Sequence, residues 1–355
     1  MASLDELRRE RLKKLSTMRE RGIPAYPASS ARDTEIRDAV GSFEDLEKKN
    51  AEMTLAGRIR TLRTQGGLIF FDLDDGTGIF QGLVKKDEIG DEPFSLFERT
   101  VDGGDFVEVK GTLFLTKRGE KTLAVREWKM LAKALRPLPD KREGLQDIEE
   151  RLRRRYLDVI ANPHERELFV KKSRFWQATR EFLLREGGLE VETPVLESIP
   201  GGADAEPFKT HHNALDEDFY LRISPELNLK RLIVAGYNKI FEIGRIFRNE
   251  GIDREHLQDY TQMEMYWAYT DYTRMMPLAE KLIKHTIHET LGGYTHEFQG
   301  KTIDWSKPWK HIDYFEIFAE YTGLDLASAT ESELASYAEK EGISLEKHLG
   351  RGRLI

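Results

Sequence analysis

The chain has 355 residues, of which 39% are hydrophobic and 33% charged, with a formal net charge of −8. These values are typical of a water-soluble protein with two or three domains. Without cysteine it has neither disulfides nor thiolate metal sites. No apolar run approaches the roughly 20 residues that cross a bilayer, and residues 1–22 are too charged for a secretory signal. We therefore expect a cytoplasmic protein without membrane contacts.

An amphipathic helix with a basic polar face is predicted at residues 4–21, and we treat residues 1–22 as a separate N-terminal helix. Its apolar side has spacings near three and four and consists of Leu4, Leu7, Leu12, Leu15 and Met18. The helix is expected to stop at Gly22, before Pro24. Two interpretations remain open: a packing helix with a solvated polar face, or a basic arm that contacts RNA phosphates.

Five strands with a helix after the third are predicted between residues 53 and 131, with the helix at residues 94–101. This is the order of an OB-fold, which we place at residues 50–135. OB-folds bind single strands by stacking bases on aromatic side chains. Phe70 and Phe71 are adjacent in the second strand, so one must point into the barrel and the other out.

Residues 136–165 are predicted to form a linker, because Pro137 and Pro139 favour extended backbone. Four arginines lie between residues 151 and 155. They could contact RNA, or they could pair with Glu149 and Glu150 on a solvated helix face.

A long helix is predicted at residues 168–185, ended by Gly187 and Gly188. Its expected apolar side consists of Phe169, Phe175, Trp176, Phe182 and Leu183. Residues 190–196 are predicted to form a strand. Pro194 removes one ladder donor, so this strand should lie at a sheet edge.

A glycine-rich loop at residues 201–208 is suited to close approach of a ligand, because Gly201 and Gly202 carry no side chain. The adjacent His211 and His212 do not define a metal site, since no third ligand is placed near them. Ser224 is predicted to cap a helix that has Pro225 at its first position.

Residues 241–267 are predicted to form two strands joined by a long polar loop. Alternation divides the second strand into an apolar face, with Met263 and Met265, and a polar face. The polar face consists of Tyr260, Gln262, Glu264 and Tyr266. In the first strand, Glu242, Gly244 and Arg248 share one face, and Gly244 is expected to leave space for a ligand.

The polar face would suit a nucleotide together with an amino acid. Arg248 offers a fork of donors to a phosphate or carboxylate. Tyr260 offers a flat surface to a base, Glu250 can accept from an exocyclic amine, and Glu264 can hold an ammonium group. We expect Arg248, Glu264 and Tyr266 to face one pocket. The alternative is a hairpin whose polar face is simply solvated.

Beyond residue 267 the pattern is mostly helical. Helices are predicted at residues 278–291, ended by Gly292, and at residues 313–321, ended by Gly323. Thr330 and Glu333 form a capping-box pattern that opens a third helix.

Several of these segments resemble the class II aminoacyl-tRNA synthetases, and within them the lysyl-tRNA synthetases. Residues 247–251, His256 and residues 260–264 resemble motif 2 of that class, and the helix and strand around Pro194 resemble motif 1. The resemblance spans nearly the whole chain. It departs at residues 257–259, Leu-Gln-Asp, where the family usually has Asn-Pro-Glu.

The resemblance implies an α+β multidomain protein. An OB-fold anticodon-binding domain would precede a class II antiparallel sheet with flanking helices at residues 166–355. It also implies a homodimer with Pro194 in the interface element, and tRNA(Lys) and lysine as partners. Phe70 would point outward and stack on an anticodon base, while Arg63 and Gln81 would read base edges.

The resemblance also implies the site residues. Arg248 is the expected catalytic residue. The expected ATP-binding residues are Arg248, Glu250, His256 and Tyr260. The expected lysine-binding residues are Gly202, Glu226, Glu264 and Tyr266. Aspartyl and asparaginyl relatives usually carry glutamine at the position of Glu226, although this carboxylate could instead merely complement the helix dipole.

The implied reaction is ATP-dependent attachment of lysine to tRNA through a lysyl-adenylate. Residues after 267 contain no glycine-rich motif 3 with its arginine. We therefore expect a truncated, inactive form whose Mg²⁺ ligands lie in the missing region. The alternatives are an aspartyl- or asparaginyl-tRNA synthetase, or a non-catalytic tRNA-binding protein that uses the OB-fold alone.

Overall fold

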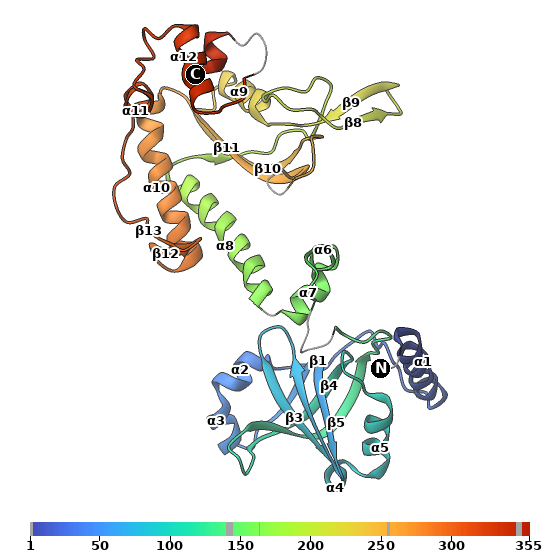
Figure 1. The fold of residues 1–355 in the computed structure, drawn as a ribbon. Coiled ribbons are helices and arrows are strands. Elements are labelled where there is room, and N and C mark those ends of the chain that lie inside the picture. The colour runs from blue at the N-terminus through green and yellow to red at the C-terminus, as the bar shows by residue number, and fades with distance from the viewer. Residues whose placement is uncertain (1–2, 140–144, 163, 254–255, 346–349) are drawn as a thin grey trace. The chain divides into compact units, whose positions relative to one another are not determined.

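The computed structural model describes residues 3–139, 145–162, 164–253, 256–345 and 350–355. The chain divides into two compact units, Met1–Arg166 and Glu167–Ile355 (Figure 1). No helix in the described part of the chain has the length and apolar character needed to cross a membrane.

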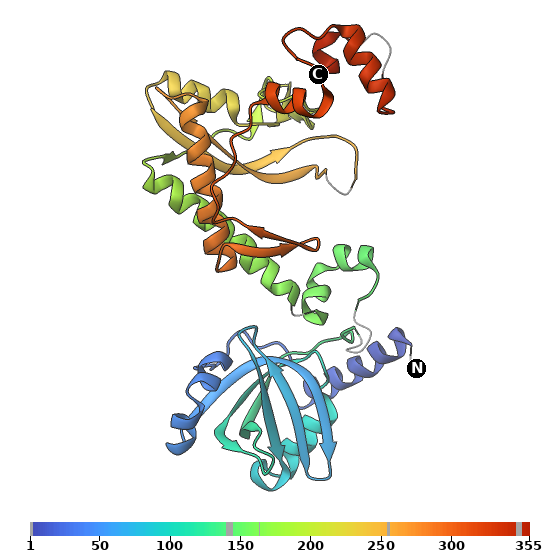
Figure 2. The same ribbon diagram turned by 60° about the vertical axis from the view of Figure 1, so that its left-hand side comes forward.

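The first unit is built on a closed five-stranded barrel with the strand order β1-β2-β3-β5-β4 (Figures 1 and 2). Its elements are β1 (Glu52–Gln65), β2 (Leu68–Asp74), β3 (Ile79–Lys85), α4 (Lys86–Ile89), α5 (Asp91–Thr100), β4 (Phe106–Leu115) and β5 (Lys121–Ala132). Helices follow the third strand, so the predicted OB-fold is confirmed.

Alternating side chains fill the barrel, as the strand period requires. In β2, Ile69, Phe71 and Leu73 are buried, whereas Phe70 is only partly buried on the outer face. The Phe71 ring lies 5.7 Å from that of Phe97 on α5. It also lies directly over Gly82, where a Cβ would come within 2.2 Å of the ring.

The N-terminal helix α1 (Leu4–Glu20) forms as predicted and begins with a capping box between Ser3 and Glu6. Its predicted apolar stripe is wrong for the first three leucines, which are exposed, whereas Leu15 and Met18 are buried.

Charged side chains anchor α1 to its own unit. Arg11 is buried and donates hydrogen bonds to the carbonyls of Gly103, Ala134 and Arg136. Lys14 pairs with Asp102 at 2.6 Å. These contacts favour the packing interpretation of the helix for Arg11 and Lys14.

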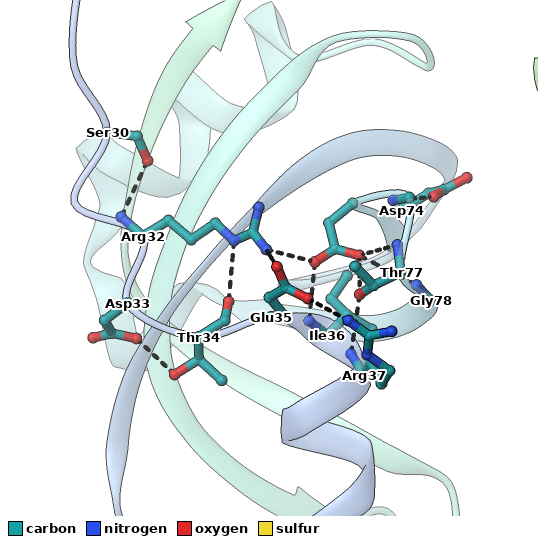
Figure 3. Close-up of polar contacts among 12 residues, drawn as sticks. Ser30, Arg32, Asp33, Thr34, Glu35, Ile36, Arg37, Asp74, Thr77 and Gly78 are labelled. Atoms are coloured by element: carbon teal, nitrogen blue, oxygen red, sulfur yellow. Dashed lines mark hydrogen bonds and ion pairs between the residues drawn. The ribbon is translucent and has the colours of Figure 1, made fainter. Parts of the chain in front are cut away.

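Two short helices, α2 (Ile36–Gly41) and α3 (Phe43–Lys48), follow α1. The Asp75 carboxylate joins α2 to the turn between β2 and β3. It accepts from the backbone amide of Ile36 at 3.0 Å and from the amide and hydroxyl of Thr77, and Arg32 lies 3.3 Å away (Figure 3).

The predicted linker contains two helices of the first unit, α6 (Ile148–Arg153) and α7 (Arg155–Ala161). Residues 140–144 of that linker lie outside the described residues. Arg151 and Arg155 pair with the buried Asp158 and with Glu165. Arg153 and Arg154 pair with Glu149 and Glu150, so all four arginines have acidic partners.

The second unit contains a three-stranded sheet in the order β11-β10-β6, where β10 is Lys239–Phe247, β11 is Asp259–Trp267 and β6 is Leu189–Glu190. Helices α8 (His164–Arg185) and α10 (Tyr272–Leu291) lie along one face of it (Figure 2). Phe182 and Leu183 of α8 and Leu278 and Leu282 of α10 pack against the apolar side of the hairpin.

The predicted strand at residues 190–196 is broken into β6 and β7 (Leu196–Glu197). Pro194 lies between them, where its missing amide and fixed φ interrupt the ladder. β6 pairs in parallel with β10 at the sheet edge. β7 joins a separate sheet, in the order β7-β9-β8, with β9 (Glu217–Leu221) and β8 (Lys209–His212).

The remaining elements are α9 (Glu226–Val234), β12 (Thr295–Phe298), β13 (Lys301–Asp304), α11 (Tyr314–Thr322), α12 (Glu331–Lys340) and α13 (Arg351–Leu354). The β12–β13 hairpin was not predicted. The helix stops at Gly292 and Gly323 are confirmed, each with a left-handed backbone, as is the Thr330–Glu333 capping box.

Candidate active site

The register of the β10–β11 hairpin positions the candidate site. Glu242 lies opposite Glu264, and Gly244 lies opposite Gln262. Directly opposed residues share a face, so one face carries these polar groups and the other carries Phe241, Ile243, Met263 and Met265 against the core. The predicted division into a polar and an apolar face is confirmed.

One group of predicted site residues lines a cavity of about 340 Å³ at the loop end of the hairpin. Its walls are Arg248, Glu250, His256, Leu257 and Tyr260. The Arg248 guanidinium lies 5.7 Å from the centre of the Tyr260 ring. Its buried Nε has no hydrogen-bond partner among the described residues. A buried donor without a partner is costly, so this group is suited to receive a ligand acceptor.

The loop of the hairpin brings His256 to this cavity. Asp253 accepts from the His256 amide at 2.8 Å, and its carboxylate lies 2.6 Å from the imidazole Nδ1. The predicted loop residues Arg254 and Glu255 lie outside the described residues. His256 is therefore oriented by a neighbouring carboxylate on the same loop.

A second group surrounds the Glu264 carboxylate. Its Oε1 accepts from Ser224 Oγ at 2.8 Å and from Gln262 Nε2 at 2.6 Å, while Oε2 accepts from the Tyr266 hydroxyl at 2.9 Å. Burial, and then the carboxylates of Glu264 and Glu226, raise the pKa of the Tyr266 phenol well above its ordinary value. Tyr266 therefore stays a hydrogen-bond donor at neutral pH.

Arg248 lines a cavity at the loop end of the hairpin, whereas Glu264 and Tyr266, which we expected to face the same pocket, hydrogen-bond to each other farther along this face. The cavity around Arg248 is walled by loop residues and Tyr260, and Glu264 and Tyr266 form their own cluster farther along the same face. Glu264 and Tyr266 stand four and six positions beyond Tyr260 on β11, which separates the two groups along the strand.

Glu226 and Gly202 lie beside the second group. Glu226 pairs with Lys230 one helical turn later at 2.7 Å. Gly202 has a φ of +87°, and a Cβ there would come within 2.8 Å of the Glu226 Cβ and 3.1 Å of Ser224 Oγ. This close contact, together with the positive φ, explains why a residue with a side chain would be strained here.

The predicted cap of α9 is displaced by one residue. Pro225, rather than Ser224, is the N-cap, and it makes no side-chain capping bond. The Ser224 hydroxyl still accepts from the Glu226 amide at 3.1 Å. Helix ends fray, so their positions are commonly defined only to within one or two residues.

The space above Gly244 is occupied by Arg222, so the prediction that it admits a ligand is wrong. A Cβ at Gly244 would lie 2.1 Å from Arg222 Nη2. Arg222 is buried and pairs with the equally buried Glu242, which also accepts from Thr193 Oγ1 at 2.7 Å. Arg222 also donates to the Arg245 carbonyl at 2.9 Å. Sequence reasoning missed Arg222, although a charged residue between apolar Leu221 and Ile223 was an available signal.

The candidate RNA-binding residues lie on the outer surface of the barrel. Arg63 is opposite Phe70 in the β1–β2 register, and Gln81 is opposite Asp72 in the β2–β3 register. Alternation places Phe70 and Asp72 on one face of β2, so Arg63, Phe70 and Gln81 share that face. Gln81 Oε1 accepts from Thr122 Oγ1 at 2.9 Å.

No group of three or more histidine, aspartate or glutamate side chains in the described ranges is arranged to hold a metal ion. His211 instead lies within 3.4 Å of the carboxylates of Asp216 and Asp218.

Comparison with known families agrees with this architecture. Residues 147–343 match the family model described as tRNA synthetases class II (D, K and N), and residues 53–131 match the OB-fold nucleic acid binding domain. The fold and site thus define a class II tRNA synthetase region preceded by an OB-fold.

Curated relatives narrow the class. The chain is 46% identical over 97% of its length to a lysine–tRNA ligase of Pelotomaculum thermopropionicum, covering 67% of that protein. It is 42% identical over 97% of its length to the enzyme of Thermotoga maritima and 41% over 96% to that of Bacillus subtilis, covering 69% and 70% of them. The chain belongs to the lysine–tRNA ligase family.

Proposed function

We propose that this protein attaches lysine to tRNA(Lys) in two ATP-dependent steps. The lysine carboxylate attacks the α-phosphate of ATP and releases pyrophosphate. A ribose hydroxyl at the tRNA end then attacks the lysyl-adenylate. One observation carries the proposal: a single hairpin face holds an arginine–aromatic cavity and, beside it, a hydrogen-bonded carboxylate cluster.

The cavity group is assigned to ATP. Arg248 holds the α-phosphate and the lysine carboxylate together, and the partnerless Nε supports this role. Tyr260 stacks on adenine, and Glu250 accepts from its amine. His256 reaches the outer phosphates. Positioning and charge stabilisation account for the rate, and no protein nucleophile is needed.

The carboxylate group is assigned to lysine. Glu264 receives an ammonium group, and Glu226 and Tyr266 complete the polar surroundings. Gly202 allows the loop backbone to approach the substrate. The three donors on Glu264 support this role, because they fix the orientation of its carboxylate.

The first unit is assigned to anticodon binding, with Phe70 stacking and Arg63 and Gln81 reading base edges. We assign residues 50–135 to this domain and residues 166–355 to the catalytic domain. We further propose a cytoplasmic homodimer whose interface includes the segment around Pro194. The partly exposed Phe169 and Phe175 on α8 support that interface. Mg²⁺ is the expected companion of ATP.

Lysine-dependent exchange of pyrophosphate into ATP tests the proposal, measured in a protein that contains these 355 residues and has the full length of the matched lysine–tRNA ligases. We expect exchange with lysine and at least about 100-fold less with aspartate or asparagine, because the carboxylates of Glu226 and Glu264 attract the cationic lysine side chain, repel the aspartate side chain and gain no charge pair from the asparagine side chain. Equal exchange with aspartate would contradict the lysine assignment.

A further inference from the structure

The hydroxyl of Ser224 lies at the centre of the carboxylate cluster. Ser224 is 1% exposed. It stands two residues before the start of α9 and reaches across to β11. Its Oγ is 2.8 Å from Glu264 Oε1 and 3.1 Å from the Glu226 amide nitrogen. One buried atom therefore connects the two elements that carry the proposed lysine-binding carboxylates.

The direction of these hydrogen bonds follows from the groups involved. An amide can only donate, so the hydroxyl oxygen accepts from Glu226, and the hydroxyl hydrogen is free to point at the Glu264 carboxylate. Both bonds are satisfied at once. Because Ser224 is buried, it acts on the substrate only through the groups that it holds.

The third proposed lysine-binding element also rests on this residue. A Cβ at Gly202 would come within 3.1 Å of Ser224 Oγ and 3.2 Å of its Cβ. The glycine loop thus packs directly on Ser224. The serine fixes the separation between that loop, the start of α9 and the Glu264 side chain.

We propose that Ser224 is a positioning residue for lysine recognition. The inference rests on the proposed function. It assigns Ser224 the task of holding Glu264 in the one orientation that meets the substrate ammonium. ATP recognition is independent of it, because the cavity around Arg248 is lined by other residues.

Calorimetric titration of the 355-residue protein with lysine, and separately with ATP, tests the inference. Ser224→Ala should raise the lysine Kd by about three- to tenfold, the usual effect of losing one hydrogen bond. The ATP Kd should change by less than about twofold. Thr179→Val is the matched control, because its buried hydroxyl donates to the Phe175 carbonyl within α8. It should leave both Kd values unchanged even if it lowers Tm.

The outcomes distinguish a failure of the positioning role of Ser224 from a failure of the proposed function. If the wild-type protein binds lysine and Ser224→Ala binds it equally well, the inference is overturned and the proposed function stands. If both Kd values rise together in Ser224→Ala, its effect is general and the positioning role is also overturned. If the wild-type protein shows no lysine binding, the proposed function fails and the inference with it.

Discussion

Arg248 is held between the Ile223 carbonyl and the Tyr260 ring, with a buried Nε that lacks a partner in the described part of the chain. Arg248→Ala should lower lysine-dependent pyrophosphate exchange by ~100-fold or more, since it removes a charged donor at the reacting phosphate. Arg245→Ala is the control, because Arg245 pairs with Asp259 at the exposed edge of the hairpin. A loss below tenfold for Arg248→Ala would place this residue away from the phosphate.

Gly244 is required by Arg222 rather than by a substrate. Gly244→Ala would push a methyl group to 2.1 Å from Arg222 Nη2 and disturb the buried pair with Glu242. We expect a loss of about 2–4 kcal/mol in the free energy of unfolding, measured in urea. Gly293→Ala has nothing within 4 Å and should change it by under about 0.5 kcal/mol. Equal effects would show that the contact carries no strain.

Individual residues of the two units show what can and cannot be predicted from the sequence at the residue scale. The faces of Glu264 and Met263 were predicted correctly, because alternation along a strand is a local property. Alternation also required that one of Phe70 and Phe71 point inward, but it was the resemblance to the family that selected Phe71, which is buried. The contact between Gly244 and Arg222 joins β10 to the residue that follows β9 of a different sheet, and no local period encodes such a contact.

At the scale of elements, the barrel was predictable because each strand buries one face and turns separate the strands. The long strand at residues 190–196 was not. Its composition favours a strand, but Pro194 and the two separate partners, β10 and β9, divide it. The predicted apolar stripe of α1 was wrong in part because contacts with distant residues also determine how the helix packs. The helix is anchored partly by Arg11, whose carbonyl partners lie more than 90 residues away.

The stability that the Asp75 hydrogen bonds contribute between α2 and the β2–β3 turn should depend on pH. Burial acts to raise the pKa of Asp75, but hydrogen bonds from Ile36, Thr77 and Gly78 outweigh it and hold the pKa below its ordinary value of 3.8. A depressed pKa in the folded state contributes stability above pH 3.8. That contribution is lost as pH falls through the folded-state pKa.

Asp75→Asn should therefore lower the free energy of unfolding by about 1–3 kcal/mol at pH 7. The gap between wild type and variant should shrink as the pH is lowered below about 4. Urea unfolding of both proteins from pH 7 to pH 2.5 measures this. If the difference in the free energy of unfolding between the two proteins stays constant with pH, the charge of Asp75 does not stabilise the contact between α2 and the β2–β3 turn.

At the scale of the whole molecule, the first unit extends beyond the predicted barrel. Its core includes Met18, Ile36 and Phe43 as well as barrel residues. A fragment of residues 50–135 would leave that surface uncovered. We expect residues 1–166 to unfold cooperatively and at a Tm at least 10 °C higher than residues 50–135, by the usual relation between buried apolar area and Tm. Equal Tm values would show that α1 to α3 are dispensable.

The two compact units should also bind their ligands separately, because each candidate site is built from residues of one unit only. Residues 1–166 should bind a lysine anticodon stem-loop, more weakly as salt rises. Phe70→Ala should weaken that binding by about 1–3 kcal/mol and leave the fold intact, whereas Phe71→Ala should unfold the fragment. Residues 164–355, which retain all of α8, should bind lysine and ignore the stem-loop. Lysine binding by residues 1–166 would contradict the assignment of one ligand to each unit. Unfolding of that fragment by Phe70→Ala but not by Phe71→Ala would contradict the assigned faces of β2.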